Sequence, residues 1–390
     1  MKKICVVTAT RAEYGVLKNT ISEIYNHPDL ELCLVVMGTH LSKNFGYTVN
    51  EIMNDGFPIA DEINMLLDSD EPDAISKSMG ITMISFADVL KRHKPDMLVV
   101  VGDRYEMISV CCCALNMQIP IAHISGGEIT EGAIDDCVRH CLTKMSNLHF
   151  PGCEEYRQRI IQLGEQPDTV FNYGDVGVEN IMRMEPMSKA ELEADLGLRL
   201  DNYICMTFHP VTTQLQYVER QMDEVLKAIA HFPEIEFIIT KANADAGGRC
   251  INEKLEEFVK LHNNCHLFAS LGIKRYISLL RGARAVVGNS SSGIIEAPIF
   301  NIPTVNIGDR QKGRLMAGSI INCDTNEEDV ASSIMFALSA EGVKQAKEAV
   351  SPYESGDTSV KIVEEIIRYL DNPGHSVAKK FYDVRFEEIK

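Results

Sequence analysis

The chain has 390 residues, of which 45% are hydrophobic and 24% are charged, and it is longer than a single compact core usually is. Its 56 acidic residues outnumber its 38 basic residues, so the net charge at pH 7 is −18. This excess of negative charge argues against nucleic acid or an anionic membrane as a partner, and we expect a small ligand instead.

No stretch approaches the roughly 18 to 20 apolar residues of a membrane span, and the N-terminus runs directly into a strand-like segment. We therefore expect a cytoplasmic protein. The twelve cysteines lack the paired spacing of a zinc site, which indicates reduced core thiols. Cys137, His140 and Cys141 share one helical face, but no fourth ligand accompanies them, so we expect no metal.

Short apolar segments alternate with helix-like stretches along the whole chain. Before residue 180, apolar residues on both faces predict buried parallel strands at 4–9, 31–37, 97–101, 119–124 and 169–173. The acidic segment 63–78 is predicted to be an exposed loop that leads to a helix at 78–93. After residue 200 the same pattern predicts strands at 203–208, 236–240, 265–268, 285–288 and 303–307.

This alternation predicts the α/β fold class, with two Rossmann-like doubly wound domains. Pro186 and a polar run, which includes a capped helix at 188–195, place the boundary within 182–202. We predict an N-terminal domain at 1–181 that carries acid and base residues. A nucleotide-binding domain at 182–370 and a polar tail at 371–390 follow. The ligand is expected beyond the carboxyl ends of the strands, in the cleft between the domains.

A serine-rich turn and a basic turn follow two of the late strands. Residues 288–293 read G-N-S-S-S-G, which suits a phosphate at a helix N-terminus or simply a serine cap. Glu296, one turn further, could bind ribose hydroxyls or favour the helix start. Residues 308–314 read G-D-R-Q-K-G-R, which suits a pyrophosphate or a solvated loop.

Arg11 follows the first strand, where a diphosphate could approach. The segment around it, T-A-T-R-A-E-Y-G at 8–15, lacks the glycines of G-x-G-x-x-G, so a nicotinamide or flavin site is disfavoured.

Acidic residues gather after two central strands. Asp103 in G-D-R could be a general base or the cap of the next helix. H-I-S-G-G-E at 123–128 leads into Glu131, Asp135 and Asp136, which form either a store of proton-transfer groups or an exposed acidic loop. His209, in F-H-P at the end of a strand, is a candidate for acid–base work or phosphate binding.

Together these motifs resemble the UDP-N-acetylglucosamine 2-epimerase family from residue 4 to about 370. The resemblance is greatest to the hydrolysing bacterial branch, which makes N-acetylmannosamine for sialic acid synthesis. It implies a glycosyltransferase B-type arrangement whose C-terminal helix crosses back to the first domain. It also implies a homodimer or homotetramer, with no metal or cofactor. The implied reaction eliminates UDP to form 2-acetamidoglucal, which is then hydrated to the 2-epimer.

By the same resemblance, Asp103, Glu128 and Asp135 transfer protons, and His209 acts on the diphosphate or in proton transfer. Substrate-binding roles fall to Arg11, Arg104, Asn243, Ser290, Ser291, Glu296, Arg310 and Arg314. One position departs from the pattern, because many relatives carry glutamate where this chain has Ser125. A serine cannot replace a carboxylate base, so that role passes to Glu128, to Asp135 or to neither. We expect Asp103 and Glu128 to act.

The sequence thus predicts a hydrolysing UDP-N-acetylglucosamine 2-epimerase. One alternative is the same reaction on UDP- or GDP-linked N,N′-diacetylbacillosamine, on the way to legionaminic acid. A glycosyltransferase of the same fold and a nucleotide-sugar sensor without activity are two others. The apolar helix at 107–117 is either an oligomer surface or packs only on its own sheet.

Overall fold

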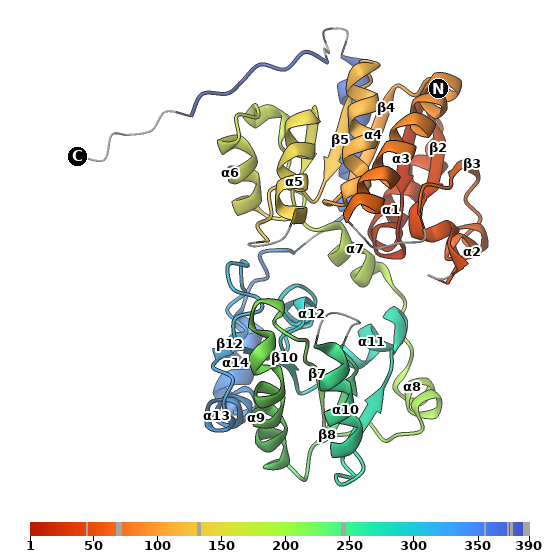
Figure 1. Ribbon diagram of the computed structural model, residues 1–390. Helices are drawn as coiled ribbons and strands as arrows, with labels where there is room; N and C mark the ends of the chain where they lie inside the picture. Colours follow the sequence, from red (N-terminus) through yellow and green to blue (C-terminus); the bar gives the residue numbers. More distant parts are fainter. Residues whose placement is uncertain are drawn as a thin grey trace. The chain divides into compact units, whose positions relative to one another are not determined.

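The computed structural model describes residues 1–43, 46–67, 72–130, 134–242, 247–354, 356–372, 374 and 377–384. The chain divides into two compact units (Figure 1). The first unit combines Met1–Asn180 with Ser355–Lys390, and the second is Ile181–Glu354. Among the described helices, none has both the length and the apolar character that a membrane span needs.

The first unit contains a six-stranded parallel sheet in the order β3-β2-β1-β4-β5-β6. Successive strands are added toward one edge from β1 to β3 and toward the other edge from β4 to β6, which is the Rossmann order. The bounds are β1 (Lys2–Thr8), β2 (Leu30–Met37), β3 (Ile59–Ile63), β4 (Met97–Val101), β5 (Ile121–Ile124) and β6 (Leu148–Phe150).

The helices of the first unit cover both faces of this sheet. Their bounds are α1 (Arg11–Asn26), α2 (Val49–Asn54), α3 (Pro72–His93), α4 (Tyr105–Asn116), α5 (Ile134–Met145), α6 (Glu154–Gln162), α7 (Val176–Arg183) and α15 (Thr358–Asp371). Helix α7 continues past Asn180 into the second unit. Apolar side chains of α1 and α15 join one core cluster, whereas those of α3, α4 and α5 join another.

The second unit repeats the same design, with sheet order β12-β11-β10-β7-β8-β9. Its strands are β7 (Tyr203–Thr207), β8 (Glu236–Thr240), β9 (Cys265–Phe268), β10 (Ala285–Gly288), β11 (Thr304–Ile307) and β12 (Ile320–Cys323). Here β7 to β9 extend toward one edge and β10 to β12 toward the other. The helices are α8 (Lys189–Leu196), α9 (Val218–Ala230), α10 (Gly248–Phe258), α11 (Gly272–Leu280), α12 (Ser291–Ile295), α13 (Glu327–Leu338) and α14 (Ala340–Glu348). The predicted α/β class with two Rossmann-like domains is confirmed.

Two local predictions were wrong. The segment 169–173 forms no strand, because a 3₁₀ turn at Pro167–Thr169 precedes it and only Val170 bridges to His149. Helix α3 begins at Pro72 rather than at residue 78, since proline is tolerated in the first turn of a helix.

The end of the chain returns to the first unit. Ile362 and Ile366 of α15 pack in the same cluster as Leu17 and Ile21 of α1. The expected boundary at residue 370 assigned this helix to the second domain, but its apolar face is buried in the first unit. This placement agrees with the returning helix that the family resemblance implied.

The described part of the polar tail also contacts the first unit. The backbone N–H of Tyr382 donates to the carbonyl of Gly164 at 2.9 Å, and Lys379 forms an ion pair with Glu165 at 2.6 Å.

Candidate functional site

Each sheet has a switch point where neighbouring strands lead to helices on opposite faces, and ligands of open α/β sheets bind there. In the first unit, the loops after β1 and β4 meet at this point, because the two strands are paired. In the second unit, β7 and β10 pair in the same way. Most of the predicted site residues lie on these four loops.

Asp103 and Arg139 form the centre of the site in the first unit. Arg139 donates a short hydrogen bond to the carboxylate of Asp103 and is itself only 5% exposed. A second nitrogen of the same guanidinium donates to the carbonyl of Glu128 at 3.1 Å and to the hydroxyl of Thr130 at 3.2 Å. Arg139 of α5 thus connects the loop after β4 with the loop after β5 through hydrogen bonds.

The carboxyl group of Asp103 has a raised pKa. Burial is the largest cause, and the nearby charge of Asp135 adds to it, whereas Arg139 acts in the opposite direction. Asp135 is thus near enough to Asp103 to act on its pKa through charge. A carboxyl group whose pKa rises toward neutrality is better suited to transfer a proton at physiological pH.

The loop after β5 carries Ser125 and the predicted proton-transfer residue Glu128. The carboxylate of Glu128 lies close enough to Cys153 to contribute to the raised pKa of that thiol, of which burial is the main cause. Ser125 adopts a φ of +61° and donates its N–H to the carbonyl of Phe150 at 2.9 Å. Glu131 lies outside the described residues.

Two buried histidines, which the motif analysis did not assign to this role, hold the loops in place. The Nε2 atom of His123 lies 2.8 Å from the carbonyl of Gly102, next to Asp103. Burial lowers the pKa of His123 to about 3, so the neutral ring donates this hydrogen bond. His40 binds the hydroxyls of Thr8 and Thr48 at 3.0 and 2.8 Å, and burial lowers its pKa to about 4.

The two predicted substrate-binding arginines of this unit each have an acidic partner. Arg11, at the start of α1, is exposed and pairs with Glu51 of α2 at 3.1 Å. Arg104, before α4, is half-buried and donates to Glu106 at 2.7 Å. Both side chains lie at the carboxyl ends of the central strands.

In the second unit, Asn289 joins three loops. Its side-chain amide donates to the carbonyl of His209 at 2.8 Å and accepts from the N–H of His209 at 2.7 Å. The carbonyl of Asn289 accepts from Arg310 at 3.0 Å and from Gln311 at 2.9 Å. The neighbouring Gly288 must be glycine, since a Cβ there would lie 1.9 Å from the carbonyl oxygen of Thr207.

The serine-rich turn forms the helix cap, which is one of the two roles that the sequence left open. Ser290 caps α12 through the N–H of Ser292, and the Ser292 hydroxyl donates to the carboxylate of Glu296. Tyr276 lies 2.7 Å from the same hydroxyl. Helix α12 has only five residues, so its dipole is that of little more than one turn.

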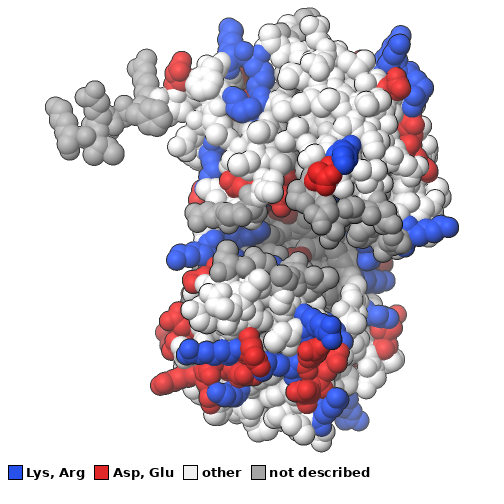
Figure 2. All heavy atoms as spheres, viewed as in Figure 1, with Lys and Arg blue, Asp and Glu red and all other residues white. Residues whose placement is uncertain are grey.

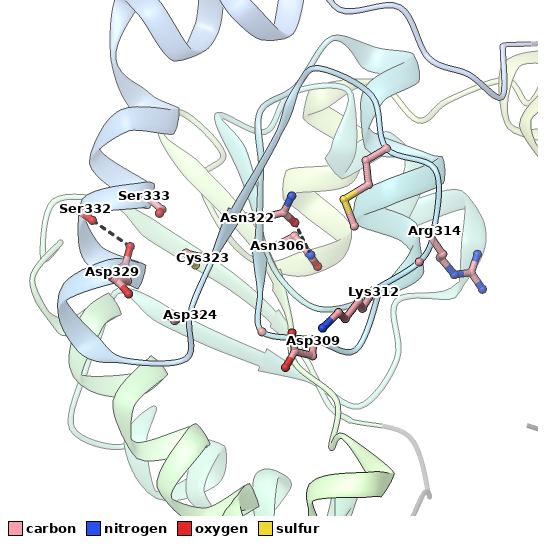
Figure 3. A pocket seen from close by; sticks show the side chains of 13 residues that line it. Asn306, Asp309, Lys312, Arg314, Asn322, Cys323, Asp324, Asp329, Ser332 and Ser333 are labelled. Carbon is pink, nitrogen blue, oxygen red and sulfur yellow. Dashed lines mark hydrogen bonds between the residues drawn. The ribbon is translucent and has the colours of Figure 1, made fainter. Parts of the chain in front are cut away.

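The three cations of the basic turn are separated. Arg310 faces Asn289, whereas Lys312 and Arg314 line a cavity of about 660 Å³ at the ends of β11 and β12. Figure 3 shows Asp309 and Lys312 at one edge of this cavity and Asp329, Ser332 and Ser333 of α13 across from them. A single diphosphate-binding cluster of all three cations is therefore not formed in the second unit.

Two further features of the sequence remain, the substrate-binding candidate Asn243 and the group of Cys137, His140 and Cys141. Asn243 lies outside the described residues. Cys137 and Cys141 are exposed free thiols, and His140 lies 3.6 Å from Asp136. Within the part of the chain that the structure describes, no group of three or more metal-ligating side chains comes together.

Two Rossmann-like units with polar loops at their switch points define a glycosyltransferase B-type α/β protein. The family model for UDP-N-acetylglucosamine 2-epimerase matches residues 22–367. The chain belongs to this family.

Named relatives span nearly the whole chain. The GDP/UDP-N,N′-diacetylbacillosamine 2-epimerase (hydrolyzing) of Campylobacter jejuni is 43% identical, covering 85% of this chain and 86% of that protein. The polysialic acid biosynthesis protein P7 of Escherichia coli is 35% identical, covering 98% of both chains. A crystal structure of Neisseria meningitidis UDP-GlcNAc 2-epimerase bound to UDP-GlcNAc has a TM-score of 0.80 at 17% identity, covering 94% of this chain and 100% of that one.

Proposed function

We propose that the protein is a hydrolysing 2-epimerase of UDP- or GDP-linked N,N′-diacetylbacillosamine. The observation that carries this proposal is the 43% identity to the Campylobacter enzyme of that name. A Legionella pneumophila protein named as a UDP-N,N′-diacetylbacillosamine 2-epimerase (hydrolyzing) adds support at 32% identity over 92% of this chain. The sequence motifs favoured UDP-N-acetylglucosamine as the substrate, whereas these relatives favour the alternative, nucleotide-linked N,N′-diacetylbacillosamine.

UDP-N-acetylglucosamine is the second candidate substrate. The Escherichia coli protein P7 supports it through its role in polysialic acid biosynthesis, and a Neisseria meningitidis UDP-N-acetylglucosamine 2-epimerase is 30% identical over 98% of this chain. The two substrates differ at C4 and C6 of the sugar, so the C2 chemistry is common to both.

The proposed reaction proceeds by elimination and hydration. A base removes the proton from C2 while the nucleoside diphosphate leaves C1, which gives a glycal. Water then adds its hydroxyl at C1, and a proton returns to C2 on the opposite face. The net change consumes one water and yields the nucleoside diphosphate and the free 2-epimer.

Asp103 and Asp135 are the proposed proton-transfer pair of this reaction. The sequence prediction paired Asp103 with Glu128, but the electrostatic coupling of Asp103 to Asp135 supports Asp135. Arg139 holds Asp103 in place through a hydrogen bond. Its charge lowers the pKa of Asp103, but burial outweighs this effect and the pKa stays raised. Arg11 and Arg104 in the first unit, and Ser290, Ser291, His209, Glu296 and Arg310 in the second, are the proposed contacts of the nucleotide.

The test is to incubate the protein in D₂O with each of the three nucleotide sugars and to follow the products by proton NMR. We expect free nucleoside diphosphate and a 2-epimer deuterated at C2, formed fastest from a diacetylbacillosamine substrate. A faster reaction with UDP-N-acetylglucosamine would support the second candidate. Three intact substrates would overturn both and leave a sensor or a transferase of the same fold.

The protein is also proposed to act as a cytoplasmic homo-oligomer. Helices α3 and α4 of the first unit expose Ile84 and Leu115, at 74% and 47% respectively. Figure 2 shows few charged side chains where Figure 1 places these helices. A self-association face of this kind would bury apolar side chains that water otherwise contacts.

A further inference from the structure

Two glutamates are buried beneath the loops that follow β1 and β4 in the first unit. Glu13 lies in the first turn of α1, and Glu106 lies in the first turn of α4. They are 7% and 1% exposed. Because α1 follows β1 and α4 follows the paired strand β4, both carboxyl groups lie at the switch point of the sheet.

Each glutamate holds one of the two loops. One carboxylate oxygen of Glu13 accepts from the N–H groups of Ala9 and Thr10, at 2.8 and 2.9 Å, directly before Arg11. One carboxylate oxygen of Glu106 accepts from Nε of Arg104. The second oxygen of each group is buried and has no hydrogen-bond partner among the described residues.

An unpartnered buried carboxylate oxygen is costly, so two of them at one point call for an explanation. Arg104 is the cation that acts on both groups. One positive charge balances one carboxylate, and the second carboxyl group is neutral only when it holds a proton.

We propose that Glu13 and Glu106 are positioning residues that anchor Arg104 and the loop of Arg11, and that the charge of Glu13 sets how strongly this corner of the first unit binds nucleotide phosphates. The inference rests on the proposed function, because it takes these two arginines as phosphate contacts. With Glu13 protonated, the group of Glu13, Arg104 and Glu106 is neutral. With Glu13 ionised, it carries a net negative charge under the phosphates and weakens their binding.

Glu13 is expected to gain and lose its proton within the physiological pH range. Burial raises the pKa of Glu13 to about 7, the charge of Glu106 adds to the rise, and Arg104 and the two backbone N–H groups oppose it. Asp103, on the same loop as Arg104, also interacts with this cation, but its carboxylate pairs with Arg139. Glu51 of α2 binds Arg11, Asp55 directly after this helix binds Tyr14, and the imidazole of His40 is neutral at this pH.

The competing explanation is that Glu13 only caps its helix. Thr10 and Glu13 form a capping box, a common device for the first turn of a helix. The chain offers a matched control, because Ser188 and Glu191 form the same capping box at the start of α8. There the side chain of Glu191 is exposed to solvent. A capping role is common to both glutamates, whereas a charge effect on phosphate binding belongs to Glu13 alone.

The experiment measures the binding of UDP and of GDP by calorimetry between pH 6 and pH 8.5, for the wild type, Glu13→Gln and Glu191→Gln. Glutamine still accepts the two N–H bonds, so Glu13→Gln is expected to fold. We expect wild-type affinity to fall by about fivefold as the pH rises through 7, a size typical of one partly screened charge at short range. Glu13→Gln should lose this fall around pH 7 and keep only the change caused by the terminal phosphate of the nucleotide, whose second pKa is about 6. Glu191→Gln should follow the wild type.

Three further readouts complete the test. In the wild type, the carbon-13 titration of Glu13 should move to higher pH when UDP is added, because the two binding events are linked. Glu106→Gln should raise KM for the nucleotide sugar several-fold and change kcat less, because it frees Arg104. The pH dependence of KM in turnover should match that of binding.

Several outcomes overturn the inference. They are an unchanged pH dependence in Glu13→Gln, a Glu13 titration that UDP does not move, and a wild type that binds neither UDP nor GDP. Nucleotide binding without turnover of any tested sugar would instead reject the proposed function and leave the inference standing on the binding data.

Discussion

At the scale of single residues, we expect substitutions of the three acidic residues to lower kcat by different amounts. Asp103→Asn should lower kcat at least about a hundredfold, since a general acid or base contributes that much. Asp135→Asn should come next, and Glu128→Gln should have the smallest effect, because the coupling to Asp103 runs through Asp135. Steady-state rates and C2 deuterium exchange measure this. A Glu128→Gln enzyme as inactive as Asp103→Asn would restore Glu128 as the partner.

Glu13 also makes stability depend on pH. Its pKa is raised from 4.5 to about 7, so the folded state binds the proton more tightly than the unfolded chain does. The stabilisation is complete below pH 4.5 and is lost as the pH rises through 7, with a total loss of about 3 kcal/mol. Urea unfolding should show Glu13→Gln gaining on the wild type between pH 5 and pH 8.5. A constant difference between the two proteins would contradict this.

Some residues of the candidate site could be predicted from the sequence, and others could not. Asp103, His209 and the serine turn were identifiable because they follow apolar strands, and strand ends meet at one edge of a parallel sheet. The pairing of Glu13 with Glu106 was not identifiable. It depends on β1 lying beside β4, two strands that are about 90 residues apart in the chain. No spacing in the sequence reports such a neighbour. The same holds for Asn289, whose partners come from two other loops.

At the scale of elements, the tail and α5 depend on each other. Lys379 donates to the carbonyls of Lys144 and Ser146 at the end of α5, and it pairs with the buried Glu165. Burial alone would raise the pKa of Glu165, but hydrogen bonds from His149, Lys144 and Lys379 outweigh it and lower the pKa to about 2.

Lys379→Ala removes one charge-assisted partner of Glu165 and a cation at a helix C-terminus. We expect a cost of about 1–3 kcal/mol, visible as a lower melting temperature. Lys380→Ala, at the next position, is the matched control and should melt like the wild type. Equal melting of both variants would show that the tail contributes no stability through Lys379.

Elements differ in how clearly the sequence predicts them. Central strands such as β1 and β4 are apolar on both faces and were predicted nearly to their ends. The edge strands β3, β6 and β12 were missed. β3 reads I-A-D-E-I with two exposed positions, and β6 has only three residues. An edge strand has one neighbour, so it needs neither length nor continuous apolar character.

At the scale of the whole molecule, composition could not show where the chain returns. The second unit begins at Ile181, next to the polar run that starts at residue 182. A polar segment with Pro352 and Gly356 also precedes α15, but it does not reveal that this helix packs on α1. A domain that is discontinuous in sequence is recognised from tertiary packing, since each segment separately looks like a continuation of its neighbour.

The proposed self-association is tested on the whole molecule as well. Ile84→Glu combined with Leu115→Glu should convert the oligomer to a monomer, because a charge buried without a partner costs several kcal/mol. Ile273→Glu is the matched control, since Ile273 is 52% exposed on α11 of the second unit. Light scattering after size exclusion reads the mass directly. A wild-type monomer, or an oligomer that survives the double substitution, would remove α3 and α4 as the contact, and α4 would then pack only on its own sheet.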